Sequence, residues 1–218
     1  DNPLLFPTLS ATTDALLQSI RSGELPRAIG YTLVLLVKGY LGGLVLAALL
    51  TAFPSVSRIG ADLLETLTSM FNPLPSIALL PLALIWFGLG DASVIFVLVH
   101  AVLWAVALNT HSGFLSVSNT LRMVGRNYGL SGLRYVSGIL IPAAFPSILT
   151  GLKIGWAFAW RTLIAAELVF GVSSGSGGLG WFIYENKNQL EIPAVFAGLF
   201  TVILIGLIVE NVIFRTVE

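Results

Sequence analysis

Five long apolar stretches, separated by short polar segments, dominate the sequence. They run through residues 28–52, 63–87, 92–109, 147–170 and 193–214. A helix of about 20 residues crosses the hydrocarbon layer of a membrane, so each stretch is long enough to be a transmembrane span. The pattern predicts an all-α, polytopic membrane protein with a single transmembrane domain over residues 1–218.

Two of these stretches carry features that a simple anchor does not need. The second is interrupted by Asn72, Pro73 and Pro75, which predicts a broken span. Because lipid cannot satisfy the carbonyl groups that a proline frees, this break should face protein or a water-filled path. In the first span, Gly39 and Gly43 form a pair of small residues that lets another helix approach closely.

The polar connections give an orientation. Residues 1–26 read as an external interfacial loop, and residues 110–146 as a cytoplasmic loop, because basic residues are more frequent in cytoplasmic loops. The basic residues then divide into an inner set, Arg58, Arg122, Arg126, Arg134 and Arg215, and an outer set, Arg21, Arg27 and Lys187. Five spans that start outside lead us to expect a sixth span before Asp1.

Composition supports a membrane protein and excludes several soluble functions. Hydrophobic residues make up 56% of the 218 residues and charged residues only 10%, against roughly 25% charged residues in a soluble domain. The formal net charge is zero, which offers no basic surface for nucleic acid. Cysteine is absent, so disulfides and thiolate chemistry are excluded.

Three charged residues lie deep in the predicted spans: Lys38, Arg161 and Glu167. Buried charges in a membrane either pair with one another or line an aqueous route, and both interpretations stay open on the sequence alone. Arg161 and Glu167 lie about 120° apart around an ideal helix, so they are poorly placed to neutralise each other. At least one of them needs a partner on another helix.

Tryptophan and histidine residues in the spans could line a path or bind a metal ion, but their spacing along the helices argues against both roles. Trp156 and Trp160 lie one turn apart and could narrow a pathway, although packing is the default for aromatic residues at this spacing. His100 and His111 lie about 16 Å apart along one helix and cannot share a metal ion. The sequence contains no phosphate-binding Gly-x-x-x-x-Gly-Lys-Ser/Thr motif, so it offers no nucleotide site of that kind.

The segment Gly129–Pro146, with its glycine-to-proline spacing, resembles the cytoplasmic loop of binding-protein-dependent ABC importer permeases. That family prefers Glu-Ala-Ala upstream, where this chain has Met123, Val124 and Gly125. Further similarity lies in Pro73–Pro75, Leu84–Gly90, Leu149–Gly155, Ala165–Glu167 and Ser174–Gly180. Together these segments resemble the nitrate, sulfonate, taurine and bicarbonate branch of the family.

The resemblance implies a fold and an assembly. The fold is the transmembrane domain of a type I ABC importer in the bacterial inner membrane. The assembly contains a second permease copy, two ATPase subunits that hold ATP and Mg²⁺, and an external solute-binding protein. The chain itself is expected to carry no cofactor, metal or catalytic residue, and its role would be import of a small anion.

The resemblance also assigns residues. A short helix from Gly129 to Val136 would be the coupling helix that contacts the ATPase. Its residues, with the proline that follows, are Gly129, Leu130, Ser131, Leu133, Arg134, Val136 and Pro142. The candidate residues for a translocation path come instead from the deep charges, the proline break and the two tryptophans, and they are Lys38, Asn72, Pro73, Pro75, Trp156, Trp160, Arg161 and Glu167.

Three alternatives stay open at this point. The segment Gly129–Val136 could be an amphipathic helix that lies on the membrane surface. The chain could be an ion-coupled secondary transporter in which Lys38, Arg161 and Glu167 form a relay, although the inverted repeats of such transporters are not evident. A membrane anchor or scaffold would leave the deep charges and the proline break unexplained.

Overall fold

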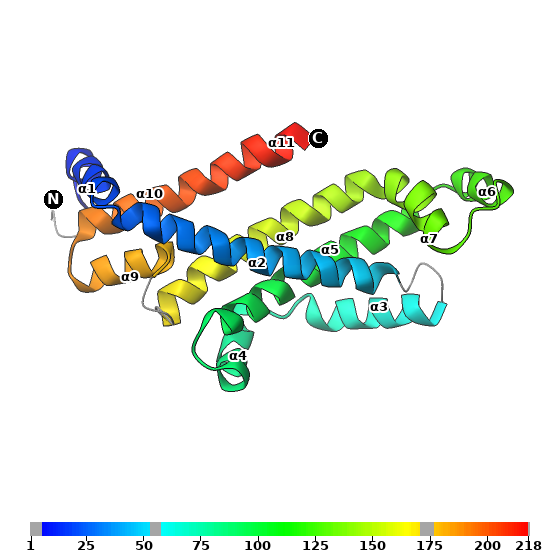
Figure 1. Ribbon diagram of the computed structural model, residues 1–218, viewed down its shortest axis with the longest axis horizontal. Coiled ribbons are helices and arrows are strands. Elements are labelled where there is room, and N and C mark those ends of the chain that lie inside the picture. Colours follow the sequence, from blue (N-terminus) through cyan, green and yellow to red (C-terminus); the bar gives the residue numbers. More distant parts are fainter. Residues whose placement is uncertain (1–5, 53–57, 171–176, 218) are drawn as a thin grey trace. The chain divides into compact units, whose positions relative to one another are not determined.

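The computed structural model describes residues 6–52, 58–170 and 177–217, and all regular structure in these ranges is helical (Figure 1). Side chains of Arg58, Phe170 and Val217 are not described. The elements in chain order are α1 (Leu9–Arg21), α2 (Glu24–Ala52), α3 (Arg58–Phe71), η1 (Ser76–Leu79), α4 (Leu80–Phe87), α5 (Asp91–Ser116), α6 (Asn119–Asn127), α7 (Gly132–Tyr135), η2 (Val136–Leu140), α8 (Ile141–Phe170), α9 (Leu179–Asn188), α10 (Ile192–Ile208), η3 (Val209–Phe214) and α11 (Arg215–Val217).

Within the described residues, four helical segments are long and apolar enough to cross a membrane. They are Glu24–Ala52, Asp91–Ser116, Gly132–Val169 and Ile192–Phe214. The helices Ile59–Phe71 and Ser76–Phe87 form a fifth candidate, a pair bent by 86° at the break between them. The predicted break at Asn72, Pro73 and Pro75 is therefore confirmed.

Helices α5 and α8 extend furthest beyond the apolar pattern. Helix α5 continues through Ser116 instead of ending at Asn109, and its polar side chains bond back to its own backbone. The Asn109 amide donates to the Ala105 carbonyl at 2.8 Å, and the Ser116 hydroxyl donates to the Gly113 carbonyl at 2.8 Å. Helix α8 begins at Ile141, six residues before the predicted start of the fourth span.

Prolines explain why the start of α8 is hard to predict. Pro142 and Pro146 lie on either side of the predicted entry to the fourth span, yet helical structure is continuous from Gly132 to Val169. The wider π-helical turn η2 precedes α8, and the Ile141 N–H donates to the Val136 carbonyl five residues earlier. A π-helical turn of this kind accommodates the missing N–H of a proline without ending the helix.

The chain folds as two compact units, to both of which α2, α5 and α8 contribute. One unit contains residues 39–78 and 98–159. Its core lies where the end of α5 meets η2 and the start of α8. The buried residues of this core are Phe114, Val117, Val136, Leu140 and Ala144.

Close helix packing in this unit confirms the expectation from the small residues of the first span. A Cβ atom added at Gly39 would lie 2.4 Å from the Leu98 Cβ, and one added at Gly43 would lie 2.5 Å from the Val102 Cβ. These distances are far inside van der Waals contact. Helices α2 and α5 therefore approach each other at positions where only glycine fits.

Replacing Gly43 with alanine should destabilise the protein, because the new methyl group overlaps Val102 and must displace α2 or α5. We expect a loss of about 1–3 kcal/mol, the usual cost of overpacking a core. Gly30→Ala, on the same helix with no atom within 4 Å of the added Cβ, is the matched control. Thermal unfolding of the purified protein measures both, and equal melting temperatures would contradict this packing.

The other unit contains residues 6–38, 79–97 and 160–217 of the described chain. In it, α1 and α9 both pack against α10. The Tyr31 hydroxyl on α2 donates to the Asp91 carboxyl at the start of α5, at 2.6 Å. Of the glycine-rich segment 171–180, residues 171–176 lie outside the described residues, and α9 begins at Leu179.

Candidate functional site

A helix that the sequence did not predict precedes the expected coupling segment. Helix α6 starts at a Ser118 cap, whose hydroxyl accepts from the Leu121 N–H. It ends at Asn127, and Gly129, the residue after the Tyr128 cap, has a φ of +71°. The Gly129 N–H donates to the Arg126 carbonyl and the Leu130 N–H to the Gly125 carbonyl. This pattern is a Schellman motif, in which a glycine with positive φ ends a helix.

The expectation of one helix from Gly129 to Val136 is corrected by this geometry. Gly129 and Gly132 both have positive φ, at +71° and +53°, and a right-handed helix cannot pass through residues in that conformation. Only Gly132–Tyr135 form the helix α7, which continues into η2. The exposed feature is therefore a helix, a glycine turn and a short second helix.

The predicted apolar side of this segment divides between surface and core. Leu133 is 75% exposed, whereas Val136 is buried in the core described above. Leu130 is half-buried, and Ser131 and Arg134 are exposed. Pro142 lies in the first turn of α8. Of the predicted coupling residues, Leu133 thus offers the largest apolar contact surface to another subunit.

Helix α6 adds an exposed surface to the segment. Leu121, Met123 and Tyr128 expose large apolar side chains, and Arg126 is exposed between them. Arg122 has a different role, because its guanidinium donates to the carbonyls of Phe114 and Val117 near the end of α5. The amphipathic spacing between the Ser118 cap and Gly129 is the signal that could have identified α6 in the sequence.

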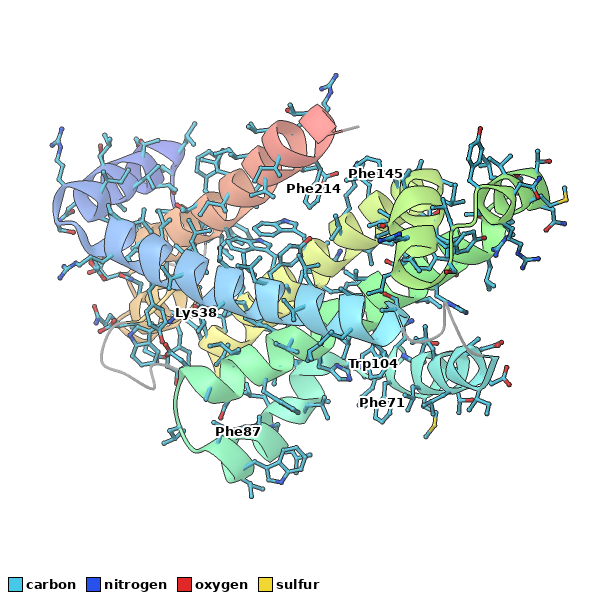
Figure 2. The ribbon with its side chains drawn as sticks, turned by 45° about the vertical axis from the view of Figure 1, so that its right-hand side comes forward. Lys38, Phe71, Phe87, Trp104, Phe145 and Phe214 are labelled. Atoms are coloured by element: carbon cyan, nitrogen blue, oxygen red, sulfur yellow. The ribbon has the colours of Figure 1, made fainter. Side chains whose placement is uncertain are left out.

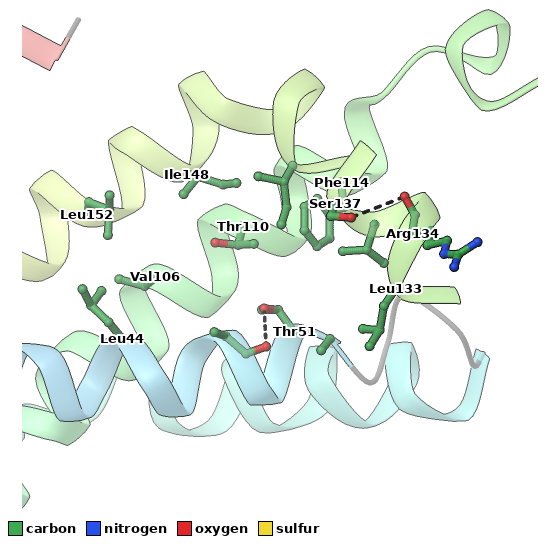
Figure 3. A pocket seen from close by; sticks show the side chains of 14 residues that line it. Leu44, Thr51, Val106, Thr110, Phe114, Leu133, Arg134, Ser137, Ile148 and Leu152 are labelled. Atoms are coloured by element: carbon green, nitrogen blue, oxygen red, sulfur yellow. Dashed lines mark hydrogen bonds between the residues drawn. The ribbon is translucent and has the colours of Figure 1, made fainter. Parts of the chain in front are cut away.

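An open cavity of about 550 Å³ lies beside α7 in the same unit (Figure 3). Its walls come from α2, α5, α7, η2 and α8 and are mostly apolar, with Leu44, Val106, Ile148 and Leu152 among them. Figure 3 shows the guanidinium of Arg134 directed away from the cavity. Helix α7 thus borders this cavity and is not packed on all sides.

The broken span contains the second group of candidate residues. Asn72, Pro73 and Pro75 are exposed at the bend between α3 and η1. Directly beside the bend, the Phe71 ring stacks on Trp104 of α5, with ring centroids 5.1 Å apart and planes 14° apart (Figure 2). The Ser76 hydroxyl lies 3.1 Å from Nδ1 of His100. Sequence reasoning missed His100 and Trp104 as parts of this group.

The deep charges fall in the unit that contains α9. Lys38 and Arg161 are exposed within that unit. Glu167 is only 4% exposed and is held by neighbouring elements. The hydroxyl of Thr32, itself fully buried, donates to its carboxyl at 2.9 Å, and the Gly180 N–H donates to Oε2 at 2.8 Å. The expected interhelical partner is confirmed for Glu167.

These contacts form a clamp of Thr32, Glu167 and the first residues of α9. The Leu179 N–H donates to the Thr32 hydroxyl at 2.8 Å. A Cβ at Gly180 would lie 2.6 Å from the Glu167 Cβ and 2.7 Å from the Ile164 carbonyl. A carboxyl group at a helix N-terminus satisfies N–H groups that have no partner inside the helix. Glu167 therefore fixes α9 to α2 and α8.

The two tryptophans predicted near a path are both packed. Trp156 lies edge-on against Tyr40, with ring centroids 6.1 Å apart, and the Tyr40 hydroxyl donates to the Leu152 carbonyl. Trp160 is 8% exposed. Their part in a translocation path stays a prediction. No group of three metal-ligating side chains occurs among the described residues.

Comparison with known proteins now decides the family. Residues 39–215 match the model of the binding-protein-dependent transport system inner membrane component. The chain belongs to this family. It is an ABC transporter permease of the inner membrane, and it is not itself the ATPase.

Relatives of the permease include proteins with named solutes. A Methanocaldococcus jannaschii protein, named as an ABC transporter permease, is 30% identical over 97% of this chain and 79% of its own length. The taurine transport system permease of Escherichia coli is 32% identical over 68% of this chain and 52% of its own. The nitrate import permease of Synechocystis is 33% identical over 72% of this chain and 56% of its own length. The permease thus spans about half the length of these two relatives.

Proposed function

We propose that this permease forms the translocation path of an ATP-driven importer for a small oxyanion. The relatives that carry solute names support an anion, since they are permeases for taurine, aliphatic sulfonates and nitrate. Lys38 and Arg161, which are cations exposed within their unit at membrane depth, are the residues proposed to border the route. The Glu167 carboxyl accepts hydrogen bonds from Thr32 and Gly180 in the clamp, so it is not among them.

Binding-protein-dependent transport implies an ATPase and a solute-binding protein as partners. We propose two ATPase subunits, which bind ATP and Mg²⁺, and a second permease copy that completes the path. The observation that carries this proposal is the exposed segment α6, Gly129 and α7, in which Leu133 is exposed on α7 just after a turn that backbone hydrogen bonds hold. A buried or fully packed loop could not dock another subunit.

Copurification from the native membrane tests the assembly. We expect the tagged permease to bring down an ATPase subunit in equal amount. An ion-coupled secondary transporter needs no such subunit, so a permease that purifies without an ATPase and still transports would contradict the proposal.

A further inference from the structure

Two buried ring nitrogens in the broken-span region have no hydrogen-bond partner. They are Nε2 of His100 and Nε1 of Trp104, and the Tyr135 hydroxyl is the remaining such atom among the described residues. A buried polar group without a partner costs about 1–3 kcal/mol. Such groups are rare in native proteins and call for an explanation in function or in a bound molecule.

The two nitrogens belong to one cluster. His100 and Trp104 are one turn apart on α5, with ring centroids 6.1 Å apart. Phe71 contacts both, stacked on Trp104 and edge-on to His100 at 6.4 Å. Figure 2 shows Phe71 and Trp104 side by side. Phe71 is the last residue of α3, directly before the break.

Ser76 determines what the histidine can offer. Its hydroxyl lies 3.1 Å from Nδ1 of His100. When the hydroxyl donates this hydrogen bond, the neutral ring carries its hydrogen on Nε2. The cluster then presents two N–H donors, one from His100 and one from Trp104, and neither has an acceptor.

The depth of the cluster places these donors near the middle of the membrane. His100 and Trp104 follow the start of α5 at Asp91 by about 14 and 20 Å at 1.5 Å per residue, in a hydrocarbon layer about 30 Å thick. The irregular backbone of residues 72–75 lies beside them and is largely exposed. Such backbone is tolerated at this depth only where it is covered by protein or lines an aqueous cavity.

We propose that His100 and Trp104 form a transient hydrogen-bonding site for the oxyanion solute at the break of the second span. The oxygen atoms of a sulfonate or nitrate would accept the two N–H groups. Phe71 would cover the donors at rest and uncover them when the bend between α3 and η1 moves. This inference rests on the proposed function and adds the residues that contact the solute.

Two neutral N–H donors suit a site through which the solute passes better than a site that retains it. Hydrogen bonds to an anionic oxygen are strong in a medium of low dielectric constant. Neutral donors add no full positive charge, so the solute is held less tightly than by a buried lysine or arginine. Conduction needs a site that binds the solute well enough to admit it and weakly enough to release it.

Trp104→Phe isolates the donor, because phenylalanine keeps a ring for stacking on Phe71 and lacks the N–H. In vesicles that contain the complete transporter, we expect ATP-driven uptake of taurine, nitrate or ethanesulfonate, whichever the wild type transports, to fall about ten-fold or more. The measurement uses saturating solute-loaded binding protein. Trp86→Phe makes the same change at an exposed tryptophan outside the cluster, so it is the control and should retain uptake within about two-fold. The expected loss in Trp104→Phe corresponds to one hydrogen bond to a charged group.

Stability separates a solute contact from a structural role. Trp104→Phe removes a donor that has no partner, which offsets part of the cost of the smaller buried ring, so its melting temperature should fall by about 4 °C at most. His100→Leu should also lose uptake, and His100→Gln, which keeps an N–H donor, should retain more of it. A loss of uptake accompanied by a matching loss of stability would show a packing role and overturn the inference.

The outcomes distinguish this inference from the proposed function. Wild-type rates in both Trp104→Phe and His100→Leu would overturn the solute contact and leave an anion importer intact. A wild-type transporter that moves none of the three anions would instead defeat the proposed function, and the solute contact with it.

Discussion

Replacing Glu167 with alanine is expected to release α9 from the spans and to destabilise the permease by about 3–5 kcal/mol. The variant removes the acceptor of the Thr32 hydroxyl and of the Gly180 N–H, both of which are buried. Each buried donor left without a partner costs about 1–3 kcal/mol, and the lost side chain also leaves a cavity. The yield of folded permease and its thermal unfolding measure the effect.

Two further variants test whether the clamp acts as a unit. Gly180→Ala should be about as damaging, because the added Cβ would overlap Glu167 and the Ile164 backbone. Glu167→Gln should be milder, since the amide keeps one acceptor oxygen. Glu191→Ala, at an exposed glutamate whose side chain makes no cap hydrogen bond to α10, is the matched control. If Glu167→Ala unfolds at the same temperature as Glu191→Ala, the clamp does not hold α9.

Gly129→Val and Leu133→Asp are expected to separate ATP hydrolysis from transport, each by a different cause. Gly129 has a φ of +71° with no atom within 4 Å of an added Cβ, so valine is disfavoured by backbone conformation alone. The α6–α7 turn would then lose its shape. Leu133→Asp would place a charge in the apolar contact proposed for the ATPase. We expect uptake to fall ten-fold or more in both variants.

Conservative substitutions give the controls for this coupling prediction. Asparagine tolerates positive φ, so Gly129→Asn should retain most of the uptake. Gly138→Ala, where an added Cβ would make an ordinary contact at 3.7 Å, tests whether any glycine in the segment matters. The membrane-surface alternative predicts a less stable protein with the ATPase still bound. Normal coupling in Gly129→Val and Leu133→Asp would place the coupling contact elsewhere, with α6 the next candidate.

The helices that cross the membrane could be predicted because their signal is local. Apolar runs of about 20 residues, the prolines at 73 and 75 and the small residues Gly39 and Gly43 each report a constraint that acts along a few turns of chain. The structure agrees on the break and on the close approach of α2 and α5. The end of α5 and the start of α8 lie beyond the apolar residues, so a pattern of apolar positions alone does not contain them.

The site depends on contacts that a local pattern does not contain. Thr32 and Glu167 are 135 residues apart in sequence, and only the need for some interhelical partner could be inferred. His100 and Trp104 read as span residues until Phe71 and Ser76 are seen beside them. Helix α6 was not predicted because Met123, Val124 and Gly125 stand where the family prefers Glu-Ala-Ala, and the coupling role of the segment after it stays a prediction.

We propose that this permease imports an anion by using ATP bound to other subunits. The most direct measurement is uptake of labelled solute into vesicles that contain the permease, its ATPase and external binding protein, with ATP either inside or absent. We predict that the solute accumulates only when ATP and binding protein are both present and that an imposed ion gradient cannot replace ATP. Accumulation driven by an ion gradient in vesicles that contain the permease alone would contradict ATP-driven import.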